Sequence, residues 1–252
     1  MKLRLIRNAT LWLEYAGMTW LVDPMFSEKG ANPPIPHTAN ERRNPLVDLP
    51  IELAELSIPD VVVLTHRHLD HWDAPAAEFL PKEVLFLCQP PDELPLIQTY
   101  GFSQVVPVIG QTEVNGVTVI RVHAQHGRGE IGERMAPVSG YVWKAPGEPV
   151  LYLTSDTIWC DSVQETLDLQ QPEVVVVHAG GAEFLEGGPI IMNVEDVLAL
   201  LAHAPAAQVT AVHMEAINHC HVTREELRQR VDQAGEGGRV QIPEDGEWVS
   251  FP

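Results

Sequence analysis

The stretch Thr65-His66-Arg67-His68-Leu69-Asp70-His71 decides how this chain is interpreted. It places three imidazoles and one carboxylate within six residues, at the end of a run, 60–65, that we predict to be a buried strand. Neutral imidazole and carboxylate are the ligands that borderline metals such as Zn²⁺ prefer. Ligand-type residues at this spacing, directly after a strand, favour a metal site over a loop of solvated histidines.

One short loop cannot complete the coordination of two metal ions, so we expect further ligands at other strand ends. His126 follows the predicted strand 117–125, Asp156 follows 150–154, and His213 follows 209–212. A rigid sheet fixes side chains well at the points where its strands end. These three residues therefore join the first four as candidate ligands.

The HxHxDH run, followed by a single His, Asp and His at later strand ends, resembles the metallo-β-lactamase superfamily of hydrolases. The order and spacing match over nearly the whole chain, and Asp23 in Leu21-Val22-Asp23-Pro24 matches the early aspartate of that superfamily. The segments 42–50 and 213–220 resemble the branch that includes ascorbate-6-phosphate lactonase-like proteins.

The resemblance implies an α+β fold, a four-layer αββα sandwich of two mixed β-sheets with outer helices. It also implies two divalent metal ions in a cleft at one sheet edge. A water or hydroxide would bridge the two ions on the side opposite Asp156. Carried over residue by residue, the first metal would be bound by His66, His68 and His126, the second by Asp70, His71 and His213, and both by Asp156.

Two dications lower the pKa of a shared water to around 7, which gives a hydroxide at neutral pH. That hydroxide attacks a carbonyl or phosphoryl centre, and the metals stabilise the charge that develops on oxygen. We expect Asp70 both to ligate and to orient the nucleophile or take its proton. Asp23 is expected to fix the tautomer of a ligand imidazole, with capping of the following turn as the alternative.

Two further histidines are candidates for a catalytic role. His178 ends the run 174–177 before Ala179-Gly180-Gly181, where it would either contact substrate or be a structural histidine. His219 lies close after the last ligand, as does Glu215, and either could donate a proton to the leaving group or be a mere neighbour of the site.

The chain of 252 residues, 45% of them apolar, is expected to form a single domain over 1–252. A long proline-rich loop, 26–57, is a candidate lid over the cleft. Asn115-Gly116 predicts a hairpin between 111–114 and 117–122. The other expected strands are 3–6, 11–15, 20–23, 84–87, 138–143 and 173–178, and the expected helices are 74–80, 161–169, 194–204 and one that begins at Thr223.

The charge balance and the apolar pattern exclude several classes of partner. A formal net charge of −19 would repel a phosphate backbone, so we expect no nucleic acid. The apolar runs are too short to span a bilayer, and arginines near Met1 occupy the place of a signal peptide's apolar stretch. Three cysteines without CxxC spacing read as reduced thiols. We expect a cytoplasmic protein that acts on a small, in some cases anionic, molecule.

Taken together, the sequence predicts a metal-dependent hydrolase of a small ester, lactone, amide or phosphoester. The alternatives are a mononuclear iron oxidoreductase of the persulfide dioxygenase kind and a non-catalytic metal-binding protein on the same fold. Zn²⁺ is the first expectation for the metal, with Mn²⁺ and Fe²⁺ compatible with the same ligands. The sequence leaves the substrate, the native metal and the oligomeric state open.

Overall fold

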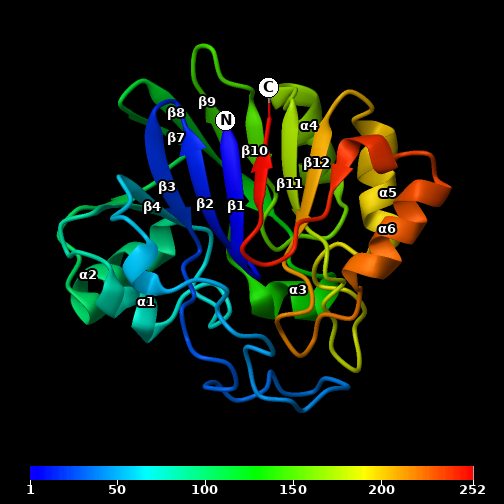
Figure 1. Ribbon diagram of the computed structural model, residues 1–252, viewed down its shortest axis with the longest axis horizontal. Coiled ribbons are helices and arrows are strands. Elements are labelled where there is room, and N and C mark those ends of the chain that lie inside the picture. Colours follow the sequence, from blue (N-terminus) through cyan, green and yellow to red (C-terminus); the bar gives the residue numbers. More distant parts are fainter. Residues whose placement is uncertain (252) are drawn as a thin grey trace.

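Two seven-stranded β-sheets face each other in the computed structural model, which describes residues 1–251 (Figure 1). The first sheet has the order β14-β1-β2-β3-β4-β5-β6. Its strands are β1 (Lys2–Arg7), β2 (Thr10–Tyr15), β3 (Met18–Val22), β4 (Val61–Leu64), β5 (Leu85–Cys88), β6 (Val105–Pro107) and β14 (Trp248–Ser250). It combines antiparallel pairs around β1 and β2 with parallel pairs from β3 to β6.

The second sheet has the order β13-β12-β11-β10-β9-β8-β7 and is also mixed. Its strands are β7 (Gln111–Val114), β8 (Val117–Ala124), β9 (Val138–Lys144), β10 (Leu151–Leu153), β11 (Val174–His178), β12 (Gln208–Val212) and β13 (Val240–Gln241). The pairs from β10 to β13 are parallel, and those from β7 to β10 are antiparallel.

Helices cover the outer face of each sheet. The first sheet packs against α1 (Ala74–Phe79) and α2 (Glu93–Tyr100), and the second against α4 (Asp161–Gln170), α5 (Val194–His203) and α6 (Arg224–Gln233). Another short helix, α3 (Gly129–Met135), lies at one end of the sandwich (Figure 1), and three 3₁₀ turns span Leu53–Glu55, Pro90–Asp92 and Gly237–Arg239. The predicted αββα sandwich of two mixed sheets is confirmed.

The strands bury one face against the other sheet because their apolar residues alternate with a period of two. In β1, Leu3 and Leu5 point into the core between the sheets, whereas Ile6 points toward the helices. Trp20 and Trp143 meet edge to face across that core, with ring centroids 6.2 Å apart. β4 reads Val-Val-Val-Leu because helices and the second sheet cover both of its faces.

The long loop predicted over 26–57 runs between β3 and β4, from residue 23 to 60. Its only regular features are the 3₁₀ turn Leu53–Glu55 and an isolated bridge between Asn32 and Asn44. It lies at the lower end of the molecule in Figure 1, together with α3 and the segments that follow β11 and β12. The loop therefore reaches the end of the sandwich at which the predicted ligands lie.

Most of the predicted elements are present within a residue or two of the expected bounds. The Asn115-Gly116 hairpin joins β7 and β8, with both turn residues at positive φ. The sequence analysis missed α2, α3 and the short strands β6, β13 and β14.

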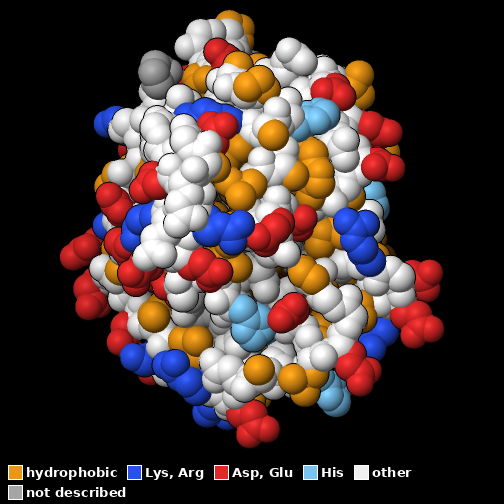
Figure 2. Space-filling view, turned by 90° about the vertical axis from the view of Figure 1, so that its right-hand side faces the viewer, with side chains coloured by type: hydrophobic (Ala, Val, Ile, Leu, Met, Phe, Trp, Pro, Cys, Tyr) orange, Lys and Arg blue, Asp and Glu red, His pale blue; other side chains and the backbone are white. Residues whose placement is uncertain are grey.

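Within residues 1–251, none of the helices has both the length and the apolar character to cross a membrane. The face that carries α5 and α6 shows acidic side chains interspersed with Lys and Arg (Figure 2).

Candidate metal centre

Four strand ends bring the predicted ligands together at one end of the sandwich. β4 of the first sheet leads into the segment 66–71, while β8, β10 and β12 of the second sheet each lead into one ligand residue. The side chains that meet there are His66, His68, Asp70, His71, His126, Asp156 and His213, all of them buried except the partly exposed His68. The two sheets thus contribute from opposite sides.

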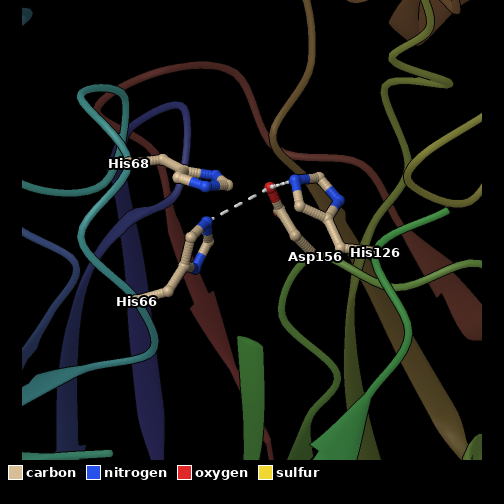
Figure 3. A group of neighbouring side chains, drawn as sticks. All are labelled: His66, His68, His126 and Asp156. Atoms are coloured by element: carbon tan, nitrogen blue, oxygen red, sulfur yellow. Dashed lines mark ion pairs between the residues drawn. The ribbon is translucent and has the colours of Figure 1, made fainter. Parts of the chain in front are cut away.

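The first cluster consists of His66, His68, His126 and Asp156. One ligand-type atom from each lies within 4.8 Å of the other three. Asp156 Oδ2 lies 3.7 Å from His66 Nε2 and 3.4 Å from His126 Nε2. Figure 3 shows His66 and His68 projecting from the loop after β4 toward His126 and Asp156, which come from the second sheet. Three imidazoles and a carboxylate at these distances can surround one cation.

The second cluster consists of Asp70, His71 and His213, and it shares Asp156 with the first. His71 Nε2 lies 3.2 Å from Asp156 Oδ2 and 3.1 Å from His213 Nε2. Asp70 Oδ2 lies 3.3 Å from His213 Nε2. The same carboxylate oxygen, Asp156 Oδ2, therefore stands between the imidazoles of both clusters.

Each ligand imidazole except His68 has a partner on the Nδ1 side, which leaves Nε2 directed at the centre. His126 Nδ1 donates to the carbonyl oxygen of Ile190 at 2.8 Å, and His213 Nδ1 lies 3.5 Å from the Cys220 thiol sulfur. His66 Nε2 is buried without a hydrogen-bond partner among residues 1–251. A buried nitrogen in that state is costly unless a ligand satisfies it, so the donor set fits a bound divalent metal.

Asp23 supports two of these imidazoles at once. Its Oδ2 accepts a hydrogen bond from His71 Nδ1 at 2.8 Å and from the Thr65 hydroxyl at 2.7 Å. Because Thr65 Oγ1 donates to Asp23, it can only accept from His66 Nδ1, 2.9 Å away. A fixed Nδ1 proton determines which ring nitrogen is free to bind metal. Asp23 thus contacts His71 directly, and Thr65 links it to His66.

Several residues around the site adopt a left-handed backbone that side chains other than glycine rarely take. Asp23, Ser155 and His213 have φ values of 44°, 59° and 58°, and Glu215 has 60°. Such conformations cost free energy and persist where the surroundings hold them. Strain therefore concentrates at the turns that aim Asp23, Asp156 and His213.

The electrostatics of the two clusters differ. Burial lowers the pKa of His66, His68 and His126, so these imidazoles are neutral and free to ligate. Burial also acts to lower the pKa of His71, but Asp156, Asp70 and Asp23 outweigh it and raise that pKa to about 10. The raised pKa of His71 means that the carboxylates around the second cluster carry more negative charge than its imidazoles neutralise.

His178 lies behind the shared carboxylate. It is fully buried, and its Nδ1 lies 2.6 Å from Asp156 Oδ1. Burial lowers its pKa to about 4, so the neutral ring donates this hydrogen bond from Nδ1. With Oδ1 held in this way, Asp156 Oδ2 is the oxygen that faces both clusters. This arrangement favours a positioning role for His178 over the substrate contact considered from sequence.

His219 and Glu215 take different places. His219 is buried beside Phe184, at a ring-centroid distance of 6.3 Å, and its Nδ1 has no hydrogen-bond partner within the described residues 1–251. Burial lowers its pKa to about 4. Glu215 instead forms an ion pair with the buried Arg224 at 2.5 Å. The carboxylate of Glu215 is thereby engaged away from the ligands, whereas His219 keeps a free nitrogen.

The sequence reading missed three of the supporting partners. Thr65 precedes the cluster without any signal of its own, the carbonyl of Ile190 carries no side-chain signal, and Cys220 belongs to no CxxC motif. Asn218 likewise lies in no recognisable motif. Its amide accepts from the Ile35 backbone N–H and donates to Thr38 Oγ1, so it ties the long loop to the segment after His213. The only sequence signal for Asn218 and Cys220 is that they follow the candidate ligand His213 closely along the chain.

Comparisons with known proteins identify the family and the fold. The model of the beta-lactamase superfamily domain matches residues 19–214. The UPF0173 protein YddR of Bacillus subtilis is 37% identical over 254 residues and covers all of both chains. Among solved structures, the isothiocyanate hydrolase from Delia radicum gut bacteria is 38% identical with a TM-score of 0.94, covering 100% of this chain and 99% of that one. A possible metal-dependent hydrolase from Veillonella parvula is 32% identical with a TM-score of 0.96 and the same coverage.

Proposed function

Because the chain belongs to the metallo-β-lactamase superfamily and is a metal-dependent hydrolase, we propose that it binds two divalent metal ions and hydrolyses a small electrophilic molecule between them. The observation that carries this proposal is the position of Asp156 Oδ2. It lies 3.4 Å from His126 Nε2 of the first cluster and 3.2 Å from His71 Nε2 of the second. A carboxylate oxygen between two imidazole groups is suited to bridge two cations.

In this proposal, His66, His68 and His126 hold one ion, Asp70, His71 and His213 hold the other, and Asp156 is common to both. When bound, the pair supplies a water of lowered pKa as nucleophile and a Lewis acid for the electrophile's oxygen, nitrogen or sulfur. Zn²⁺ suits the imidazole-rich donor set, and Mn²⁺ or Fe²⁺ would also be accepted by these ligands.

Asp70 and His219 are the residues we assign to proton handling and substrate contact. Burial acts to raise the pKa of Asp70, but His71 and His213 outweigh it and hold that pKa well below its usual range, so the carboxylate is ionised and accepts a hydrogen bond from the attacking water. The neutral imidazole of His219 can donate from one ring nitrogen to the atom of the substrate that gains charge. His178 keeps Asp156 in place.

The substrate class we propose is a small carbon electrophile: an ester, lactone, amide or isothiocyanate, with phosphoesters as a further class. The likeness to an isothiocyanate hydrolase over the full chain supports the isothiocyanate. Water would add across its C=N bond to give a thiocarbamate, R–NH–C(=O)–SH, which breaks down to the amine R–NH₂ and carbonyl sulfide. Lactones stay in the proposal because of the lactonase-like segments 42–50 and 213–220.

The test combines metal analysis with a substrate panel. Protein stripped with chelator and reloaded with Zn²⁺, Mn²⁺ or Fe²⁺ is expected to bind two ions per chain and to hydrolyse members of an ester, lactone, amide, isothiocyanate and phosphodiester panel only when loaded. A protein that holds one iron per chain and consumes oxygen with a persulfide would overturn the proposal. A metal-loaded protein that is inert on the whole panel would also count against it.

A further inference from the structure

A cavity of about 740 Å³ opens at the end of the sandwich that carries the metal centre. The long loop contributes Ile35–His37 to its wall, α3 contributes Ile131 and Met135, and the segment after β11 contributes Phe184 and Leu185. Cavities of this size accept a small organic molecule. No residue of this cavity belongs to the ligand set, so the metal centre does not itself explain it.

Residues that line the cavity also lie beside residues of the metal centre. A second cavity of about 160 Å³ is lined by Asp70 and Leu69 and shares Ile35 and Pro36 with the larger one. On the other side, Phe184 packs near the ring of His219. A molecule whose reactive carbon lies at the metals would therefore extend toward the larger cavity.

The surface that lines the two cavities is mainly apolar. Leu69 lines the smaller cavity and Leu185 the larger one, and the two leucines are 64% and 68% exposed. The charged groups of the larger cavity occur in both signs, Arg128 and Arg134 with Glu130 and Glu186, so no net charge selects for an ion.

From these observations we propose that the larger cavity binds an apolar alkyl or aryl group attached to the electrophilic carbon of the substrate. This inference rests on the proposed hydrolase function, which it deepens by naming the part of the substrate that is recognised. Burying an apolar group is worth about 25 cal/mol per Å². Substrates with a larger apolar group are therefore bound and turned over more efficiently than those with a methyl group.

The wall of the cavity is closely packed. Gly187 has a φ of 101°, and a Cβ added there would come within 1.9 Å of Ile131 Cδ1. Only glycine lets the segment after β11 pack this closely on α3. An isolated bridge between Glu183 and Pro189 closes the same segment into a small hairpin. A preformed pocket binds with less loss of conformational entropy than one that must be ordered by its ligand.

The experiment measures selectivity rather than absolute rate. In zinc-loaded protein, kcat/KM for benzyl isothiocyanate is expected to exceed that for methyl isothiocyanate by about tenfold or more, with a parallel trend in phenyl esters of increasing acyl chain length. In Phe184→Ala and Leu185→Ala this ratio falls toward one. Leu169→Ala is the matched control, because Leu169 is also an exposed leucine, 77% exposed, but lies at the end of α4. It keeps the wild-type ratio.

A binding measurement separates this inference from the hydrolase proposal. Zinc-loaded protein is titrated with benzylphosphonate and with methylphosphonate in a calorimeter, which needs no turnover. Tighter binding of the benzyl compound, lost in Phe184→Ala and kept in Leu169→Ala, supports the pocket even if no panel substrate is hydrolysed. Equal binding of the two phosphonates, or an unchanged preference in both pocket variants, overturns the pocket even if hydrolysis is found.

Discussion

The first and second clusters share Asp156 but differ in the charge that surrounds their imidazoles. Three histidines stand around one carboxylate in the first, and their pKa values are lowered by burial. In the second, Asp156 is joined by Asp70 and the hydrogen-bonded Asp23, and these three carboxylates raise the pKa of His71 to about 10 despite burial. The first cluster is thus ready to ligate, whereas the second attracts a cation more strongly but holds a proton that the metal must displace.

Removing the shared carboxylate is the harshest test of this comparison. In Asp156→Ala both clusters lose their common ligand, so we expect metal content to drop toward zero and activity to fall by about 10³-fold or more. Metal analysis and circular dichroism on the same samples separate loss of metal from loss of fold. Asp168→Ala is the matched control, because Asp168 also pairs with a histidine, His203 at 2.9 Å, on the exposed surface. Two metals per chain in Asp156→Ala would remove this residue from the centre.

Emptying one cluster at a time is expected to have the next largest effect. His126→Ala should leave only the second ion, and His213→Ala only the first, with activity reduced by about 10²-fold in each because one Lewis acid is lost. Metal content measured by mass spectrometry is expected to be one per chain in both variants. A pair of variants that each retain two ions, or each retain none, would mean that the clusters are not separate sites.

The hydrogen bonds behind the ligands should distinguish the clusters more finely. Asp23→Ala removes the acceptor for His71 and for Thr65, so both sites are expected to lose about 10- to 100-fold in metal affinity. Thr65→Val breaks only the link to His66 and should weaken the first site alone. Competition with a chromogenic chelator, in the His126→Ala and His213→Ala backgrounds, measures each site by itself. Equal losses at both sites in Thr65→Val would contradict this division.

The pH dependence of metal binding follows from the same difference. The pKa values of His71 and His213 are both raised, that of His71 to about 10, so near neutral pH the second site must release at least one proton when metal binds, and its affinity rises as pH rises. Each displaced proton changes the affinity by about tenfold per pH unit. The first site, with neutral imidazoles, is expected to change little between pH 6 and 8. Zinc titrations of the two single-cluster variants across this range, repeated in buffers of different ionisation enthalpy, count the protons released.

The convergence of the ligands could be predicted from sequence because the chemistry and the strand pattern point to the same places. Each ligand follows an apolar run, and β4, β8, β10 and β12 indeed end there. Such strand signals are local, and so is the Asn115-Gly116 turn. The strand β14 was missed because it is three residues long and forms only by pairing with β1 from the other end of the chain.

The supporting residues around the site were harder to predict, because their roles depend on distant segments. α3 carries two glycines among seven residues and has little intrinsic preference for helix, so its packing against Ile190 and Phe184 determines it. Cys220 and His178 become partners of His213 and Asp156 only in the folded chain. The candidate metal ligands are all His or Asp that follow a strand, whereas partners such as Thr65, Cys220 and the Ile190 carbonyl have no residue type in common.

Asn218 offers the mildest test, because it lies beside the second cluster but serves the substrate cavity. Its amide nitrogen donates to the Ile35 carbonyl at 3.1 Å and its amide oxygen accepts from Asn44 Nδ2 at 2.7 Å, so it holds the long loop over both cavities. Asn218→Ala should loosen that wall and raise KM for a benzyl substrate by about fivefold, the equivalent of about 1 kcal/mol. Metal content and kcat are expected to change much less, because no ligand is touched. If metal were lost from the second cluster instead, the residue would belong to the metal site rather than to the wall of the cavity.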